Sequence, residues 1–159
     1  MESSASQAAA FQIIINEVQS ACEKLQKANS FVLCTAPRDL PKKGIYVISD
    51  GDECLYVGRS NNIPRRLKYH TACNHNQATF AFLLARKLTG QIKATYKKEG
   101  SRAALLKQLD FKKAFDDARG KIRNMSVRVI EENDATRQAL LEICAAITFR
   151  AKHNDFENH

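Results

Sequence analysis

Arg66 and Glu142 are the residues whose types and settings first suggest chemistry. The guanidinium of Arg66 presents a planar fork of N–H donors that suits phosphate oxygens, although a surface arginine on a basic helix would look the same. Glu142 lies in the almost wholly apolar segment ALLEICAAITF, where a buried carboxylate needs a cation or a hydrogen-bond donor. A divalent metal ion would give Glu142 a role, whereas a helix-surface position or an ion pair with an arginine would make it structural.

Tyr46 and Tyr56 lie in two strand-like segments separated by a turn. Residues 44–49 and 53–58 are rich in Ile, Val, Tyr and Leu, and Asp50-Gly51-Asp52 between them is typical of a hairpin turn. Such tyrosines are most often sheet-core aromatics with their hydroxyls at the edge. The register of the hairpin therefore decides whether the two phenols can act together.

The length of the turn sets that register. A three-residue loop pairs Ser49 with Glu53 and Tyr46 with Tyr56, which puts both tyrosines on one face of the sheet. A two-residue loop would pair Tyr46 with Leu55 and send the tyrosines to opposite faces. We predict the three-residue loop.

A short helix should follow the hairpin and carry Arg66. Ser60-Asn61-Asn62 predicts its cap, and Pro64 suits its first turn, where a missing N–H has little effect. The helix should run to about His70. Arg66 and His70 are four residues apart and therefore share a face of this helix.

Apolar periodicity predicts the remaining elements. The apolar face of the first helix must be covered either by this domain or by a second copy of the chain, and the apolar run at 31–34 could add a strand or pack in extended form. The predicted elements are helices at 6–28, 76–88 and 135–150, the last capped by Asn133 or Asp134, and a strand at 125–131.

We expect an α+β domain at residues 41–159 with an N-terminal helical extension, residues 1–40, packed on it. Residues 96–121 are strongly charged and helical in pattern, so we interpret them as an insertion into the domain. Its lysines could contact phosphates, and a solvated amphipathic helix is an equally good interpretation.

The overall composition favours a polyanionic partner. The chain has 159 residues, a net charge of +8 and a pI near 9.4, which suits nucleic acid, although a solvated basic surface is the simpler alternative. No apolar run approaches the about 20 residues needed to cross a bilayer. The five scattered cysteines include no CxxC and indicate reduced thiols, so we expect a cytoplasmic protein, with a nucleoid or nucleus as other intracellular locations.

Taken together, these residues resemble the GIY-YIG nuclease family over about residues 44–154. The second triplet has valine in place of isoleucine, and the order and spacing of the other positions match. The matching positions are Gly44-Ile45-Tyr46, Tyr56-Val57-Gly58, Arg66, His70, Glu142 and Asn154.

The resemblance implies a three-stranded antiparallel sheet flanked by helices and metal-assisted hydrolysis of a phosphodiester, usually in DNA, with Mg²⁺ or Mn²⁺. Glu142 would bind the metal ion, and Arg66 would hold the scissile phosphate. By the same resemblance, Tyr46 would be the general base or would orient the attacking water, and Arg59 and His70 would polarise that phenol by hydrogen bonding and positive charge. Tyr56 would contact phosphate or shape the pocket. Asn154 would orient backbone or substrate.

Two functions from different classes fit this pattern. The favoured hypothesis is a metal-dependent DNA endonuclease, because every expected catalytic position holds a usable residue. The alternative is a nucleic-acid-binding module with a nuclease-like fold and little or no cleavage. Specificity would come from the insertion, the N-terminal helix, a homodimer or a partner protein.

Overall fold

A computed structural model describes residues 4–91 and 100–156. The chain divides into two compact units, each described here by itself. The first, termed the sheet unit, comprises Met1–Phe31, Thr35–Pro64 and Ser126–His159, and the second, termed the helical unit, comprises Val32–Cys34 and Arg65–Met125. None of the helices within the described ranges is long and apolar enough to span a membrane.

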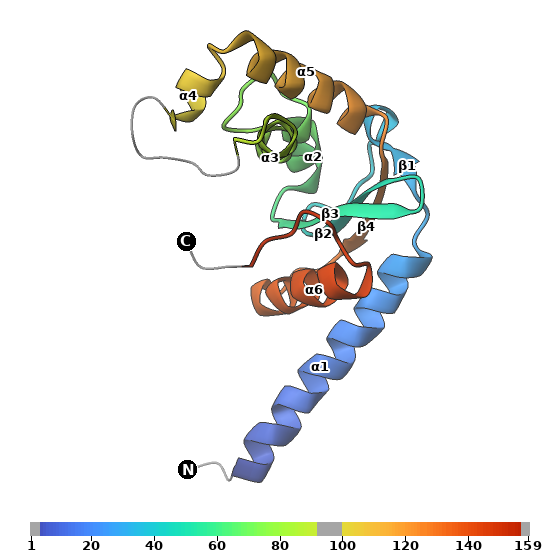
Figure 1. Cartoon of the computed structure of the whole chain (residues 1–159). Helices are drawn as coiled ribbons and strands as arrows, with labels where there is room; N and C mark the ends of the chain where they lie inside the picture. The colour runs from blue at the N-terminus through green and yellow to red at the C-terminus, as the bar shows by residue number, and fades with distance from the viewer. Residues whose placement is uncertain (1–3, 92–99, 157–159) are drawn as a thin grey trace. The chain divides into compact units, whose positions relative to one another are not determined.

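The sheet has four strands rather than the predicted three (Figure 1). Strands β2 (Gly44–Asp50), β3 (Glu53–Ser60) and β4 (Ser126–Glu131) form its antiparallel centre, with β2 between the other two. The fourth, β1, is only Phe31–Val32 and extends the order to β1-β4-β2-β3. For the apolar run at 31–34, the sequence left a strand and an extended segment as alternatives. Its first two residues form this edge strand, and the 3₁₀ helix η1 (Leu33–Thr35) follows.

The predicted pairing of Tyr46 with Tyr56 is wrong, yet the two tyrosines still share a face. Asp50 pairs with Glu53 across a two-residue turn, and Tyr46 pairs with Gly58. A bulge near Ile48, which pairs with Tyr56, adds one residue to β3 and so restores the alternation that the shorter turn would have reversed. The ring centroids of Tyr46 and Tyr56 are 6.2 Å apart.

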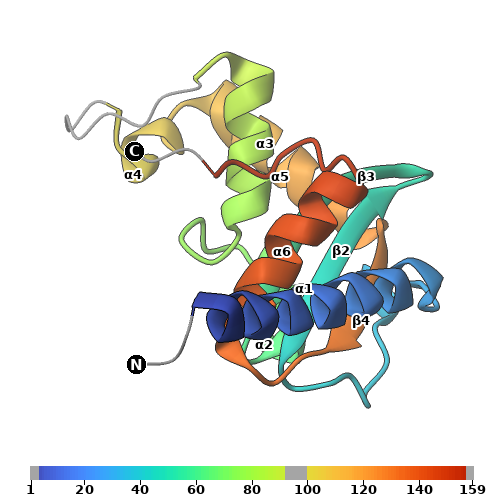
Figure 2. The same ribbon diagram turned by 90° about the horizontal axis from the view of Figure 1, so that it is seen from below.

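Two helices, α1 (Ser4–Lys27) and α6 (Ala135–Thr148), cover one face of this sheet (Figures 1 and 2). Asp134, one of the two predicted caps, accepts a hydrogen bond from the backbone N–H of Arg137 and so begins α6. The core between the layers is formed by Val18, Cys22 and Leu25 of α1, Leu141 and Ala145 of α6, and Ile45, Val47 and Val57 of the sheet.

Only the C-terminal half of α1 is covered by this core. Towards the N-terminal end, the side chains of Phe11 and Ile13 are 58% and 59% exposed. The sheet unit therefore covers Val18, Cys22 and Leu25 and leaves the first turns of the helix outside its core.

The helical unit is built around Phe82. Helix α2 (Ile63–His70) leads into it, and the unit continues with α3 (Thr79–Thr89), α4 (Arg102–Leu105) and α5 (Leu109–Arg123). Phe82 lies 5.0 Å from Phe111 and 6.0 Å from Phe115, measured between ring centroids. Of the predicted insertion, residues 96–99 lie outside the described residues, and residues 100–121 include α4 and most of α5.

Candidate active site

Gly58 makes room for the ring of Tyr46. Tyr46 on β2 pairs with Gly58 on β3, so the two residues lie directly opposite each other. A Cβ atom added at Gly58 would overlap with the hydroxyl oxygen and ring carbons of Tyr46. Tyr46 is fully buried, and its hydroxyl end therefore lies at Gly58, one residue before Arg59. The second signature glycine is thus explained by the first signature tyrosine.

Gly44 is required for a different reason. Its φ of +152° is one that residues with a Cβ atom rarely adopt. A Cβ added at Gly44 would also overlap with the carbonyl oxygen of Ile130. The start of β2 can therefore lie close to the end of β4 only because residue 44 lacks a side chain. In addition, the backbone N–H of Ile63 donates to the carbonyl of Lys42 at 2.8 Å, which places the start of α2 beside this same end of the sheet unit.

Arg59 and Glu142 form an ion pair at the end of β3. The Nε of Arg59 donates to Oε2 of Glu142 at 3.1 Å, with the arginine side chain 47% exposed and the glutamate 21% exposed. Strand alternation places Arg59 on the same face as Val57, which is the face that α6 covers. The structural alternative considered for Glu142, an ion pair with an arginine, is thus present.

Alternation divides the predicted residues between the two faces of β3. Tyr46 and Tyr56 point away from the α6 layer, whereas Arg59 points towards it. Glu142, which Arg59 binds, therefore does not share a face of β3 with the tyrosines. The two groups are instead neighbours along the strand, because the Tyr46 hydroxyl lies at Gly58 and the Arg59–Glu142 pair begins at the next residue.

Burial raises the pKa of the Glu142 carboxyl above its usual range, and Arg59 opposes that rise by charge and hydrogen bonding. The net direction is upward, so the single arginine does not fully compensate the loss of water around the carboxylate. Further positive charge near Glu142 would therefore stabilise its ionised form.

Asn154 holds the chain that follows α6 against β3. Its side chain makes two hydrogen bonds to Val57, accepting from the backbone N–H at 2.8 Å and donating to the carbonyl at 2.7 Å. The backbone N–H groups of Lys152 and His153 donate to the carbonyls of Cys54 and Leu55 at 3.2 and 3.0 Å. This tail pairs with an otherwise open strand edge up to Val57, where the candidate site begins.

Arg66 and His70 lie in the helical unit. The guanidinium of Arg66 donates to the hydroxyl of Thr79 at 3.0 Å and to the carbonyl of Gln77 at 3.4 Å, at the start of α3. His70 is fully buried and meets Phe80 edge to face, with the ring centroids 6.1 Å apart. Burial, assisted by the positive charge of Arg66, lowers the pKa of His70 to about 3.

His70 is therefore neutral at neutral pH and can supply a hydrogen bond but no positive charge. Of the two residues predicted to polarise a tyrosine, Arg59 remains as the cation. The predicted positions of Arg66 and His70 relative to the hairpin remain predictions.

Comparison with known protein families matches residues 42–139 to the GIY-YIG catalytic domain. The chain belongs to the GIY-YIG family. This match spans both signature triplets, Arg66 and His70, and ends three residues before Glu142. No curated protein and no solved structure gave a significant match to the chain.

The GIY-YIG domain also carries partners that sequence reasoning missed. Thr79, which holds Arg66, is the first residue of an apolar helix without any distinctive pattern. The pairing of the tail with β3 has no signal in the polar sequence HNDFENH. Gly58 was visible as part of a motif, but its contact with Tyr46 depends on the hairpin register.

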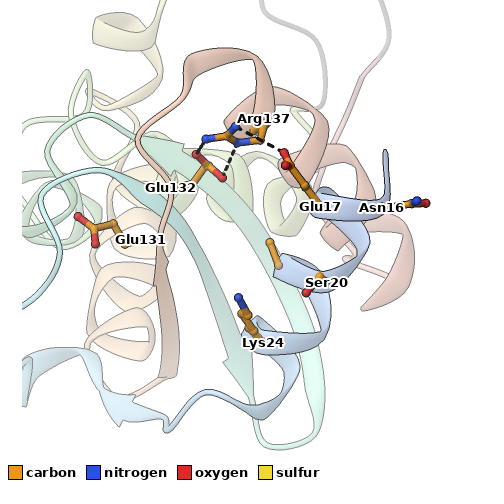
Figure 3. Close-up of a pocket in the computed structure, with 8 residues that line it drawn as sticks. Asn16, Glu17, Ser20, Lys24, Glu131, Glu132 and Arg137 are labelled. Carbon is orange, nitrogen blue, oxygen red and sulfur yellow. Dashed lines mark hydrogen bonds and ion pairs between the residues drawn. The ribbon is translucent and has the colours of Figure 1, made fainter. Parts of the chain in front are cut away.

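A groove with a volume of about 560 Å³ lies elsewhere in the sheet unit, between α1 and the segment that joins β4 to α6 (Figure 3). Arg137 forms ion pairs with Glu132 and Glu17 across it, at 3.2 and 3.5 Å. None of the predicted site residues lines this groove, and its arginine is already paired with two carboxylates. We therefore assign the groove no catalytic role.

Proposed function

We propose that this chain is a divalent-metal-dependent endonuclease that hydrolyses phosphodiester bonds in DNA. The observation that carries the proposal is the Arg59–Glu142 pair, one residue along β3 from the point where Tyr46 crosses Gly58. A carboxylate and a guanidinium thus lie at the end of an edge strand of a GIY-YIG domain, and two phenols lie next to them along that strand on its opposite face. Membership of this family supports nuclease chemistry.

Glu142 suits Mg²⁺ or Mn²⁺ as a single carboxylate ligand. Mg²⁺ commonly keeps several waters and takes only one or two carboxylates from a protein. Within residues 4–91 and 100–156, no group of three or more His, Cys, Asp or Glu side chains could hold a metal ion, so water and substrate would complete the coordination. A bound ion would neutralise charge on the leaving oxygen, and it would compensate the carboxylate whose burial Arg59 only partly offsets.

Burial separates the roles of the two tyrosines. Tyr46 is fully buried, whereas Tyr56 is half-buried on the same face. We therefore assign contact with the attacking water to Tyr56 and support of that phenol to Tyr46, which reverses the roles expected from the sequence. A free phenol has a pKa near 10, so a neighbouring cation such as Arg59 would be needed to make either tyrosine a useful proton acceptor.

The remaining residues act by positioning and charge. Arg59 would exchange Glu142 for a phosphate oxygen, for which its half-exposed guanidinium is suited. Arg66 would bind the scissile phosphate and stabilise the charge that develops on it. His70 would contribute hydrogen bonding in its neutral form. Asn154, with both ends of its amide bound to Val57, would position β3 rather than the substrate.

A plasmid assay tests the proposal. Supercoiled DNA and an RNA of similar length are incubated with the protein, with Mg²⁺, with Mn²⁺ or with EDTA. We expect nicked or linear DNA only with metal, and a loss of about 100-fold or more in Glu142→Gln, the scale of removing a group that stabilises transition-state charge. The matched control is Glu53→Gln, because Glu53 is also ion-paired in the sheet unit, with Lys152, but away from the site.

Two outcomes would contradict the proposal. Cleavage by Glu142→Gln at the parental rate would remove Glu142 from the site. A folded parent that cuts neither nucleic acid with either metal would favour the second candidate, a binding module. That candidate is supported by the Arg59–Glu142 ion pair, which already satisfies one oxygen of the carboxylate without a metal ion.

A further inference from the structure

The positive charge of the chain is concentrated in the helical unit. Its segment 65–125 contains 15 lysines and arginines and 4 acidic residues, a balance of +11. The rest of the chain contains 10 basic and 13 acidic residues, a balance of −3, which together give the net +8. Polyanion binding should therefore depend chiefly on this unit.

Arg86 and Arg102 stand out within this unit because both lie over the buried ring of Phe82. Their Cζ atoms are 5.2 and 4.8 Å from the ring centroid. Arg102 is held in place by a hydrogen bond from Nη1 to the carbonyl of His75 at 3.2 Å. Two guanidiniums are thus fixed near one aromatic ring, with their motion restricted before any ligand arrives.

Two acidic side chains of α5 in the helical unit are already paired with other cations. Asp116 is bound by Lys112 and Arg119, and Asp117 is bound by Lys113. No ion pair among the described residues involves Arg86 or Arg102.

Arg86 itself is incompletely satisfied. Its Nε and Nη2 atoms are buried without a hydrogen-bond partner in the described part of the chain. Burial and the nearby charge of Arg102 both lower the pKa of Arg86, which means that its charged form is disfavoured where it stands. A cation that is partly dehydrated, next to a like charge and without a carboxylate, is stabilised when an anion binds beside it.

We infer that Arg86 and Arg102 form a phosphate-binding anchor of the helical unit that binds the backbone of duplex DNA and takes no part in the cleavage chemistry. The planar guanidinium is the side chain best suited to a phosphodiester oxygen pair, and the surrounding excess of positive charge favours a polyanion over an isolated phosphate ion. The inference rests on the proposed function for its choice of DNA as ligand.

The test measures binding without cleavage. The affinity of the full chain for a fluorescent 20-base-pair duplex is followed by anisotropy in EDTA over a range of salt concentrations. Arg86→Met and Arg102→Met should each weaken binding about ten-fold at low salt and reduce the slope of log K against log salt by about 0.9, the loss of one phosphate contact. The control, Lys113→Met, removes the same charge from the same unit, but from a side chain already paired with Asp117.

Stability distinguishes a binding role from a structural one. Arg86→Met should leave the melting temperature unchanged or raise it, because it removes a buried charge without a partner. If Arg86→Met does not fold, the binding role is tested with Arg102→Met and with Arg86→Lys. Arg86→Lys keeps the positive charge but lacks the two-pronged guanidinium. The anchor is refuted if the binding losses and salt slopes of Arg86→Met and Arg102→Met equal those of Lys113→Met.

The outcome is independent of the cleavage assay. A chain that shows these binding losses but cuts no DNA would refute the endonuclease proposal and retain the anchor. A chain that cuts DNA, with Arg86→Met and Arg102→Met binding like Lys113→Met, would retain the endonuclease proposal and refute the anchor.

Discussion

The phenol of Tyr46 crosses the backbone at Gly58 so closely that a methyl group on Gly58 would overlap with its hydroxyl and ring carbons. The tyrosine of the first signature triplet is therefore seated by the glycine of the second. This contact links β2 to the edge strand β3 and brings the buried hydroxyl to within one residue of Arg59.

Gly58→Ala should destabilise the protein, because the ring of Tyr46 is fully buried and cannot move aside without displacing its neighbours. We expect a loss of about 1–3 kcal/mol, as for overpacking of a core, measured by urea unfolding. The control is Gly120→Ala in α5, where an added Cβ meets nothing within 4 Å. That change should stabilise by up to about 1 kcal/mol through helix propensity, and equal effects of the two substitutions would contradict the contact.

Arg59→Met should raise the pKa of Glu142 further, because Arg59 lowers it at present. A carboxyl whose pKa is raised on folding contributes stability at low pH that is lost as the pH rises through its folded-state value. Arg59→Met should therefore lose stability relative to the parent at neutral pH more than at acid pH. Titration of the Glu142 carboxyl by ¹³C NMR measures the shift, with Lys113→Met as a charge-matched control. A Glu142 pKa that does not move would show that the ion pair is absent in solution.

His70 should remain neutral until the pH is well below its ordinary value, since burial lowers its pKa to about 3. A histidine with a depressed folded-state pKa contributes stability above its unfolded value of about 6.5, and that stability is lost as the pH falls from there towards 3. His70→Gln should remove this part of the pH dependence, which urea unfolding at several pH values can measure. An NMR titration of His70 with a midpoint near 6.5 would refute the burial.

Asn154→Ala should release the tail from β3, because it removes both hydrogen bonds to Val57. We expect a loss of about 1–3 kcal/mol, for two bonds of about 1 kcal/mol each plus the cost of unpaired backbone groups. Hydrogen exchange of the Val57 amide should accelerate most. Gln12→Ala, which removes only an exposed bond to Asn16, should change stability by less than about 0.5 kcal/mol. Unchanged exchange at Val57 in Asn154→Ala would mean that the tail is held by other contacts.

Motif residues and strand patterns in the sequence are sufficient to identify the family. The two triplets, Arg66 and His70 lie close in sequence, and their local order follows from turn chemistry and helix periodicity. The predicted helices and strands are present, and their ends differ by a few residues, as for α3, which starts at Thr79 rather than at residue 76.

The hairpin register shows why local reasoning can reach a correct face by a wrong route. The turn residues are compatible with loops of two or three residues, and a bulge leaves no clear mark in a sequence that is apolar on both sides. The shared face of Tyr46 and Tyr56 was predicted correctly, but it results from a two-residue turn and a bulge, not from a three-residue loop.

By itself, the sequence determined the residue types, the strands and helices that carry them, and the family. Those depend on spacing along the chain, which is local information. Tertiary structure alone decided that Glu142 meets Arg59, that Asn154 binds Val57, and that Arg86 and Arg102 lie over Phe82. Arg59 and Glu142 are 83 positions apart, Val57 and Asn154 are 97 apart, and Arg102 is 20 from Phe82; only Arg86, four residues after Phe82 on α3, is a local neighbour. No local periodicity specifies which distant side chains packing brings into contact.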